Sequence, residues 1–319
     1  MIDFQVDIKC GFLISLAKQS VFLGNSVTAV ALGTFDGIHI GHQSIINKAI
    51  ELAGSVGGTS VVFSFSNHPL SVLAPERAPL LIGDNISKVQ AIEELGAEVL
   101  INIPFTEKLS KQSPEMFLQL LRDNLHPMFV VTGPNFSFGC RGKGNPRLLK
   151  RIGNEYGFQT EIADGVSFDG HLVSSTRIRE MIADGRLEEA NEYLGRLYSF
   201  GGIVSHGDHR GRKLGFPTAN LPIVEGRAML PNGAYAVYVL VKGRRYMGIA
   251  NVGNNPTFEG CSRRVEVYIL DFNEDIYGSS IEVRFKAKLR DEKKFPGVEA
   301  LITQLHRDEE KARSILIDG

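Results

Sequence analysis

The sequence predicts an α/β fold in two parts: a parallel β-sheet with helices on both faces, followed by a small antiparallel β-barrel with a C-terminal helix. In residues 1–190, apolar segments of strand length alternate with segments of helical periodicity, which is typical of a covered parallel sheet. In residues 191–319, strand-like segments follow one another directly and are separated by Gly and Asn, which is typical of a barrel. The 319 residues are enough for two domains of about 100–200 residues each, and we predict the boundary between them at residue 190.

The first part alternates strands and helices in a regular order. The predicted strands are Val27–Leu32, Thr59–Phe65, Glu98–Ile103 and Met128–Thr132. After the first strand, apolar residues recur at helical spacing, at Ile45, Ile46, Ala49, Ile50 and Ala53. A second helix covers Ser87–Leu95 and ends at Gly96, and a third begins with Ser113 as its N-cap and Pro114 in its first turn. Such sheets bind ligands beyond the carboxyl ends of their strands.

The periodicity of the apolar residues changes after a helical stretch, Ser175–Leu194. The predicted strands of the second part are Ala234–Val241, Arg245–Val252, Arg264–Phe272 and Ile281–Leu289, and a last helix covers Val298–Ile317. Turn residues such as Asn232 and Gly233 separate the strands. We therefore predict a small antiparallel barrel.

Composition excludes several classes of protein. Hydrophobic residues make up 43% and charged residues 22%, as in soluble globular chains. No apolar run approaches the roughly 20 residues of a membrane helix, and we see no secretory signal. Cys10, Cys140 and Cys261 lie far apart, so we expect no disulfide framework and a cytoplasmic protein. Neither half is basic enough to require nucleic acid as a partner. The sequence does not indicate an oligomeric state.

The first candidate site is the loop between the first strand and the first long helix. Gly33 and Gly37 allow a tight turn and a close approach of the backbone to a ligand. His39 and His42 are three residues apart at the start of the helix, so both imidazoles can face one side. Helix N-termini favour anions, and imidazole donors would stabilise charge on a phosphoryl group. A helix cap, a surface accident or a zinc site are the alternatives, although no third ligand stands at metal spacing.

A second segment, Ser174–Arg179, supports the phosphate interpretation. It carries hydroxyl and guanidinium donors at the point where a loop enters a helix, although an N-cap followed by surface arginines would look the same. With Gly33–His42, this segment resembles the two signature motifs of the HxGH nucleotidyltransferase superfamily, whose domains are Rossmann-like.

The second candidate site opens the barrel, at Gly207–Asn220. Its glycines and basic residues suit a flap over phosphates, and a solvated hairpin is the alternative. Thr218 and Asn220 are two residues apart, so on an extended segment their neutral oxygens face the same way and suit Mg²⁺. Glu266 lies among alternating apolar residues; facing inward it would be a costly functional acid, and facing outward it would be a solvated strand residue.

The second part as a whole resembles the riboflavin kinases. The matching stretches are Gly215–Asn220, Asn251–Gly253, Pro256–Phe258, Val265–Glu266, Asp271–Phe272, Ile276–Gly278 and Leu289–Phe295. Together the halves resemble the bacterial bifunctional riboflavin kinase/FAD synthetases over about residues 15–315. The resemblance implies an FMN adenylyltransferase domain at 1–190 and a riboflavin kinase domain at 191–319. The alternatives are an HxGH nucleotidyltransferase for another acceptor with a flavin-binding barrel, and a barrel that binds RNA or stores flavin.

For the kinase reaction, the resemblance implies transfer of the γ-phosphoryl group of ATP to riboflavin, giving FMN. Thr218 and Asn220 would hold Mg²⁺ and phosphates, and Glu266 would accept the proton of the substrate hydroxyl. Gly211 and Gly215 would belong to the flap, and Arg290 to a loop that closes on the flavin.

For the adenylylation, the resemblance implies that FMN and a second Mg·ATP give FAD and pyrophosphate. His39 and His42 would stabilise the phosphoryl groups. Further binding residues would be Gly33, Phe35, Asp36, Asn135, Ser175, Thr176 and Arg179. Asn135 and Asn145 stand where relatives often carry Asp, Ser66–Pro69 departs from a Pro-His-Pro turn, and Tyr268 stands where relatives often have His.

Overall fold

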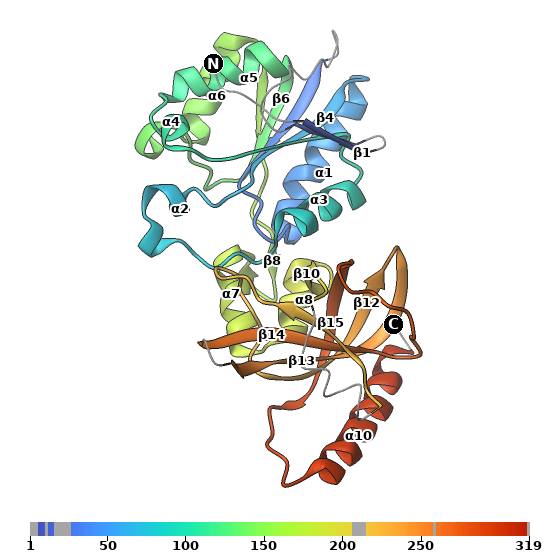
Figure 1. Ribbon diagram of the computed structural model, residues 1–319. Coiled ribbons are helices and arrows are strands. Elements are labelled where there is room, and N and C mark those ends of the chain that lie inside the picture. Colours follow the sequence, from blue (N-terminus) through green and yellow to red (C-terminus); the bar gives the residue numbers. More distant parts are fainter. Residues whose placement is uncertain (1–5, 10–11, 16–26, 206–214, 258–259, 318–319) are drawn as a thin grey trace. The chain divides into compact units, whose positions relative to one another are not determined.

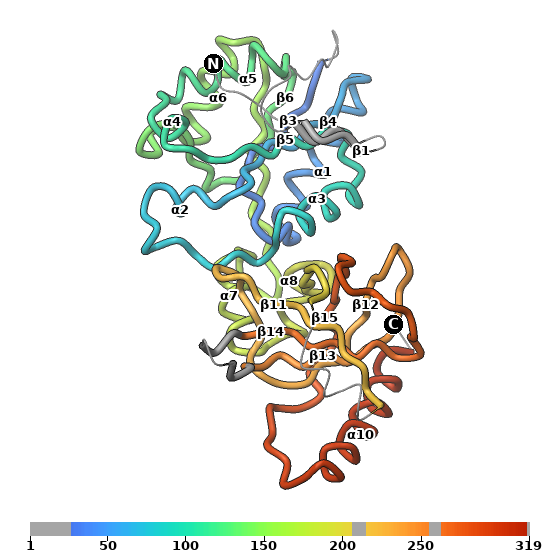
Figure 2. The backbone as a smooth tube through the Cα atoms, viewed as in Figure 1, coloured from blue at the N-terminus to red at the C-terminus, as the bar shows by residue number. Residues whose placement is uncertain are grey.

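The computed structural model describes the chain except residues 1–5, 10–11, 16–26, 206–214, 258–259 and 318–319 (Figures 1 and 2). The chain forms two compact units. The first comprises Met1–Leu81 and Lys88–Ser175, and the second comprises Ile82–Ser87 and Thr176–Gly319. No helix among the described residues is long and apolar enough to cross a membrane.

The first unit is built on a seven-stranded sheet in the order β1-β2-β5-β4-β3-β6-β7. Its strands are β1 (Val6–Lys9), β2 (Phe12–Ser15), β3 (Thr28–Leu32), β4 (Thr59–Phe65), β5 (Val99–Ile103), β6 (Pro127–Thr132) and β7 (Gln159–Ile162). All neighbours pair in parallel except β1 and β2, which are antiparallel. The predicted parallel sheet is therefore confirmed.

Helices cover both faces of this sheet (Figure 1). They are α1 (Ile40–Ser55), α2 (Leu70–Leu73), α3 (Asn85–Glu94), α4 (Glu107–Ser110), α5 (Pro114–Leu125) and α6 (Pro146–Tyr156), with 3₁₀ turns η1 (Pro75–Arg77) and η2 (Cys140–Gly142) and a hairpin of β8 (Ser167–Phe168) and β9 (His171–Leu172). Strand alternation separates two cores. Val30 packs in a cluster with α5 and α6, and its neighbour Ala31 packs in a second cluster with α1 and α3.

The second unit contains a six-stranded antiparallel sheet in the order β10-β15-β12-β13-β14-β11. Its strands are β10 (Tyr198–Ile203), β11 (Thr218–Pro222), β12 (Gly233–Val241), β13 (Arg244–Thr257), β14 (Gly260–Ile269) and β15 (Ser280–Asp291). Just beyond β10, the N–H of Ser205 donates to the Asn220 carbonyl on β11 at 2.9 Å, so the two edges meet. The curled antiparallel sheet confirms the predicted barrel architecture.

In the described part of the second unit, three helices accompany the sheet: α7 (Ser175–Asp184), α8 (Leu187–Leu194) and α10 (Val298–Leu316). The predicted helical stretch 175–194 is interrupted at Gly185, whose φ of 75° ends α7. α10 lies against β12 and β13 (Figure 2). Ala312 and Leu316 form its buried contact with that sheet.

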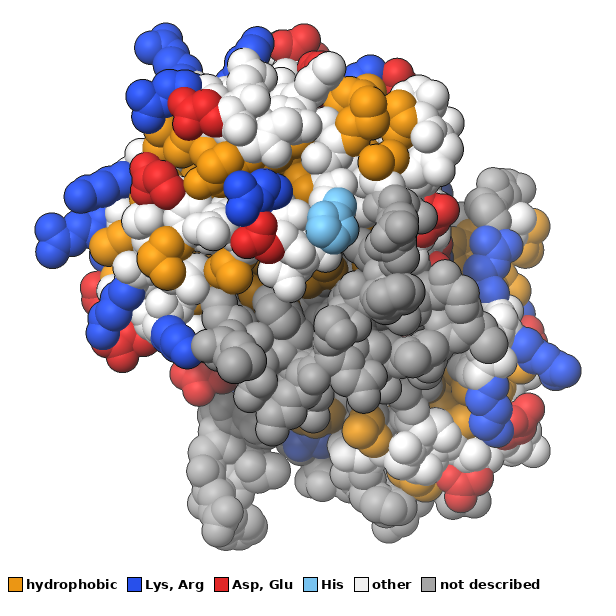
Figure 3. Space-filling model, turned by 90° about the horizontal axis from the view of Figure 1, so that it is seen from above, with side chains coloured by type: hydrophobic (Ala, Val, Ile, Leu, Met, Phe, Trp, Pro, Cys, Tyr) orange, Lys and Arg blue, Asp and Glu red, His pale blue; other side chains and the backbone are white. Residues whose placement is uncertain are grey.

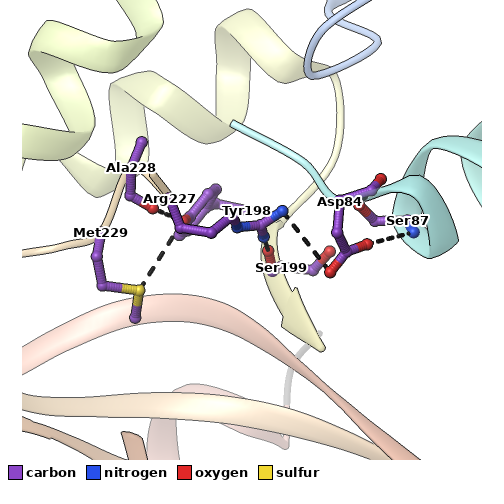
Figure 4. A network of polar contacts seen from close by, with 7 residues as sticks. All are labelled: Asp84, Ser87, Tyr198, Ser199, Arg227, Ala228 and Met229. Carbon is purple, nitrogen blue, oxygen red and sulfur yellow. Dashed lines mark hydrogen bonds and ion pairs between the residues drawn. The ribbon is translucent and has the colours of Figure 1, made fainter. Parts of the chain in front are cut away.

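The segment 82–87 belongs to the second unit because of a polar network around Arg227 (Figure 4). The guanidinium of Arg227 donates to the Ser199 carbonyl at 3.2 Å and lies 3.6 Å from Asp84 Oδ2. Asp84 Oδ1 accepts from the N–H of Ser87 at 2.7 Å and so caps α3. α3 therefore starts in one unit and continues into the other.

Charges on the first unit are dispersed. In the view of Figure 3, Lys and Arg side chains alternate with Asp and Glu among the described residues, with apolar side chains between them. Interspersed charge of this kind is the ordinary surface of a globular domain.

Candidate active sites

The loop between β3 and α1 has an unusual backbone. Phe35 and Ile38 adopt positive φ values of 47° and 41°, and Gly37 has a φ of 84°. Phe35 and Ile38 are completely buried, so their side chains hold this strained backbone in place. Strain of this kind is maintained only where the surrounding structure determines it, and it clusters at functional sites.

The two predicted histidines lie together at the start of α1. His39 is the N-cap residue, and its Nδ1 accepts from the N–H of His42 at 3.2 Å. The two imidazole rings are stacked with centroids 3.6 Å apart, and the edge contact of His42 with Phe35 spans 5.3 Å. Position 41 has little room for a side chain, because a Cβ built on Gly41 would lie 3.2 Å from the His39 imidazole. The spacing of the motif thus produces a paired imidazole surface at a helix N-terminus.

The Ser174–Arg179 segment contacts this loop through Ser175, which belongs to the first unit. Ser175 Oγ donates to the Asp36 carbonyl at 3.0 Å, although the two residues are far apart in the sequence. Asp36 is itself buried. Thr176 and Arg179 lie on α7 and belong to the second unit; Thr176 is exposed and Arg179 is half-buried.

A cavity of about 550 Å³ opens beside the histidines. Its lining includes Gly33, Thr34, His39, His42 and Asn135. Six phenylalanines form an aromatic wall of this cavity: Phe63, Phe65, Phe105, Phe117, Phe136 and Phe138. Volumes of roughly 300–1,000 Å³ with apolar walls and a few polar groups are typical of small-molecule sites.

The sequence analysis did not identify this aromatic wall. Its signal was present, because Phe-Ser-Phe occurs twice, at Phe63–Phe65 and at Phe136–Phe138. In the first case the alternation of a strand puts both rings on one face, just where β4 ends. The ring centroids of Phe136 and Phe138 are 5.6 Å apart, and the planes of the two rings are nearly parallel.

Asn67 and Asn145 have structural partners. Asn67 Oδ1 accepts from the N–H of Phe105 at 2.7 Å, and its Nδ2 donates to the Phe105 carbonyl at 3.1 Å. Asn145 caps α6 by accepting from the N–H of Leu148 at 3.0 Å. Asn135, by contrast, is exposed on the cavity lining.

In the second unit, strand register assembles the candidate residues in one row. Asn220 on β11 pairs with Glu266 on β14, and Glu266 pairs with Asn251 on β13. Asn251 then pairs with Ala234 on β12, and Ala234 with Arg290 on β15. Directly paired residues share a face of the sheet, so one row brings Asn220, Glu266 and Arg290 to the same face.

The register also resolves which way Glu266 faces. Its neighbours Val265 and Val267 are completely buried in the barrel interior. Glu266 therefore lies on the outer face, the orientation that the sequence analysis associates with a solvated strand residue. Its side chain is 37% exposed, and its Oε1 lies 3.8 Å from Arg264 Nη1. Arg264 Nη1 also donates to Asn220 Oδ1 at 3.3 Å, so a guanidinium joins the carboxylate and the amide.

The remaining predicted residues surround this row. Thr218 pairs with Tyr268 in the adjacent row, on the same face as Glu266. Gly215 turns with a φ of 86°, while Gly211 lies outside the described residues. β15 extends through Arg290, so this residue is on the strand and not in a loop; its Nε is 2.8 Å from Oδ2 of the buried Asp308. Among the described residues, no group of three or more His, Cys, Asp and Glu side chains could hold a metal ion.

Comparison with known proteins gives each unit a counterpart. Residues 24–177 match the family model of FAD synthetases, and residues 194–316 match that of riboflavin kinases. A bifunctional riboflavin kinase/FMN adenylyltransferase from Listeria monocytogenes is 39% identical over 287 residues, which are 89% of this chain and 91% of the relative. The chain belongs to this bifunctional family.

Other relatives of the bifunctional family agree. The enzymes of the same description from Bacillus subtilis and Escherichia coli strain K12 are 36% and 34% identical, each over 89% of this chain and 91% of the relative. A crystal structure of a macrolide-efflux protein from Streptococcus pneumoniae superposes with a TM-score of 0.82 at 33% identity, covering 95% of this chain and 99% of that one. Helix α8 lies between the two family matches, in the second unit.

Lys88 is a further polar residue near the Gly33–His42 loop that the sequence analysis missed. Its Nζ donates to the carbonyls of Phe65 at 2.7 Å and Thr34 at 3.0 Å and to Ser64 Oγ at 3.3 Å. Burial of the ammonium lowers the pKa of Lys88 from its ordinary value of 10.5 to about 8, while the nearby Asp36 carboxylate opposes that shift. A single lysine in an amphipathic helix looks like an ordinary exposed lysine, so the sequence does not predict such a contact.

This pKa predicts a dependence of stability on pH. Between about pH 8 and 10.5 the folded state has released the Lys88 proton while the unfolded state still holds it, so the free energy of unfolding rises with pH. Below pH 8 this contribution is absent. At about 1.4 kcal/mol per pKa unit, the gain between pH 7 and 10 is roughly 2–3 kcal/mol. Urea unfolding followed by circular dichroism, with Lys88→Met as the reference, measures it; equal pH profiles for both proteins would contradict the prediction.

Proposed function

We propose that this chain makes FAD from riboflavin in two ATP-dependent steps, with adenylylation in residues 1–190 and phosphorylation in residues 191–319. The observation that carries the proposal is that each family match contains its own polar centre. The first is the stacked pair His39 and His42 beside an aromatic cavity, and the second is the row with Asn220 and Glu266.

In the kinase step, riboflavin's terminal ribityl hydroxyl attacks the γ-phosphorus of ATP. The bond between this phosphorus and the bridging oxygen of the leaving ADP breaks, and Glu266 takes the hydroxyl proton. The carboxylate of Glu266 is half-exposed and lies 3.8 Å from the guanidinium of Arg264, so a substrate hydroxyl can reach it as a proton acceptor. Arg264 offers a guanidinium to transferred phosphate oxygens. Gly215 and Gly211 belong to the phosphate flap, and Arg290 contacts the flavin from the end of β15.

Thr218 and Asn220 have the donor chemistry that Mg²⁺ accepts, namely neutral oxygens that share one face of the sheet with a carboxylate. Bound there, the ion would neutralise phosphate charge. Asn220 Oδ1 already accepts from Arg264 at 3.3 Å, so the guanidinium and the ion compete for this oxygen.

In the adenylylation step, a phosphate oxygen of FMN attacks the α-phosphorus of ATP, and the bond to pyrophosphate breaks. The substrate supplies the nucleophile, so the protein contributes positioning and charge stabilisation. His39 and His42 donate to the phosphoryl oxygens at the N-terminus of α1. Gly33, Phe35 and Asp36 belong to the nucleotide loop, whose Asp36 carbonyl accepts from Ser175 Oγ. Thr176 and Arg179 are assigned to nucleotide binding because they belong to the same sequence motif as Ser175. The phenylalanine wall and Asn135 suit the flat, apolar flavin ring.

The test is product analysis by chromatography. Riboflavin with ATP and Mg²⁺ is expected to give FMN and then FAD, and FMN with ATP and Mg²⁺ is expected to give FAD directly. Omission of Mg²⁺ or addition of a chelator should stop both. Unchanged riboflavin in the complete mixture would contradict the kinase assignment, and unchanged FMN would contradict the adenylyltransferase assignment.

A further inference from the structure

Lys88 joins three segments at the carboxyl edge of the first sheet. It projects from α3 to the end of β4, where it binds the Phe65 carbonyl, and to the loop after β3, where it binds the Thr34 carbonyl. Ser64 Oγ lies between them, accepting from Lys88 at 3.3 Å and donating to the Thr34 carbonyl at 3.0 Å. The Thr34 carbonyl is therefore held from two directions.

The ammonium group is saturated by these contacts. A lysine ammonium has three N–H donors, and Lys88 makes three hydrogen bonds. No donor remains for a substrate phosphate. Any influence of Lys88 on a bound nucleotide must therefore pass through the Gly33–Asp36 loop.

That loop depends on such support. Phe35, the residue after Thr34, has a φ of 47°, a conformation that costs free energy for a non-glycine residue. Because the peptide group is planar and trans, fixing the Thr34 carbonyl toward Lys88 also fixes the Phe35 N–H in the opposite direction. Gly33 and Thr34 line the cavity with His39 and His42, so the orientation of this peptide bears on the site.

A packing role alone would not explain why a charged lysine occupies position 88. Enclosing an ammonium is unfavourable, as its lowered pKa reflects, and an apolar side chain of similar length would avoid that cost. The cation also lies close enough to Asp36 for their charges to interact. Burial of the Lys88 ammonium costs desolvation free energy, but its hydrogen bonds fix the geometry of the loop.

We propose that Lys88 is a positioning residue for adenylyl transfer, which holds the Thr34–Phe35 peptide and thereby the loop that leads to His39 and His42. The kinetic part of this inference rests on the proposed adenylyltransferase function, whereas the effect on the loop does not.

The first experiment measures the loop directly in the full-length chain. In Lys88→Met, hydrogen–deuterium exchange in a peptide that spans Leu32–His42 should be at least about tenfold faster, because local opening of the loop is no longer opposed by the ammonium. A peptide from α5 should be unchanged. Lys48→Met is the matched control, since Lys48 is a surface lysine of α1 that pairs with Glu51. Unchanged exchange at Leu32–His42 in Lys88→Met would overturn the inference, whatever the enzyme activity.

The second experiment measures FAD formation from FMN and ATP. Misplacement of a catalytic loop costs on the order of 100-fold in rate, so kcat of Lys88→Met should fall by about that factor while KM for FMN changes less than about threefold. Ser64→Ala, which removes one of the two bonds to the Thr34 carbonyl, should lower kcat in the same direction by about three- to tenfold. Ser64→Ala also tests the inference if Lys88→Met does not fold.

A kcat within twofold of wild type in Ser64→Ala and in any folded Lys88→Met would overturn the inference, as would parallel losses of kcat, FMN affinity and thermal stability. Failure of the wild-type chain to make FAD would instead count against the proposed function, and the exchange measurement would still decide the role of Lys88.

Discussion

Glu266→Gln is expected to abolish FMN formation from riboflavin and to leave FAD formation from supplied FMN intact. The substitution keeps the size and shape of the side chain but replaces one acceptor oxygen with an NH2 donor and so removes the base. Loss of a positioned general base lowers rates by about 10²–10⁴-fold. The carboxylate lies 3.8 Å from Arg264 and faces Asn220 across the β11–β14 ladder, so the remaining polar centre keeps its framework.

A matched control exists in the same barrel. Glu282 on β15 also pairs with an arginine two residues away, Arg284, at 3.1 Å. Glu282→Gln should keep kinase activity within about twofold, because Glu282 pairs with Leu240 and lies outside the row of Asn220, Glu266 and Arg290. If Glu266→Gln left FMN formation unchanged, Glu266 would be an ordinary strand carboxylate. If it removed both activities from a folded chain, the two reactions would not have separate sites.

His42→Ala should have the converse effect on the two activities. It removes a donor from the N-terminus of α1 and the ring that stacks on His39 at 3.6 Å. Removing one preorganised donor from a site of developing charge costs about 10²–10³-fold. FAD formation from FMN should fall by that factor, while FMN formation from riboflavin should not change.

The measurement is again chromatography of the two separate reactions. His171→Ala is the control, since His171 is exposed on β9 in the same unit. It should retain both activities. Full FAD synthesis by His42→Ala would show that the stacked imidazoles only cap the helix, and loss of FMN formation in a folded variant would contradict the assignment of the kinase to residues 191–319.

The strands β3 to β6 and the helices α1, α3 and α5 of the first unit could be predicted because each has a local cause, whereas β1, β2, β7 and α6 were not predicted. The strands β3, β4, β5 and β6 lie within one residue of the predicted limits at both ends, since continuous apolar runs identify buried parallel strands. Ser113 caps α5 as predicted, by accepting from the N–H of Met116. β10 and β11 were not predicted as strands, because Gly201, Gly202 and Pro222 interrupt any alternating pattern.

Site residues within a short segment could also be predicted. The proximity of His39 and His42 follows from helical spacing, and the common face of Thr218 and Asn220 follows from strand alternation. Contacts between distant segments could not. The face of Glu266 depended on which residues of β14 were buried, and its neighbours depended on the register of five strands.

The main strands and helices, the two-part organisation and the local geometry of each motif are predictable from the sequence, because they depend on neighbouring residues and on the periodicities of helix and strand. Three features required the folded chain: the contact of Lys88 with the Thr34 carbonyl, the two Phe-Ser-Phe segments that line the cavity beside the histidines, and the row that Arg290 shares with Glu266. Such encounters are set by packing and strand register between segments far apart in the chain, and no local pattern encodes them.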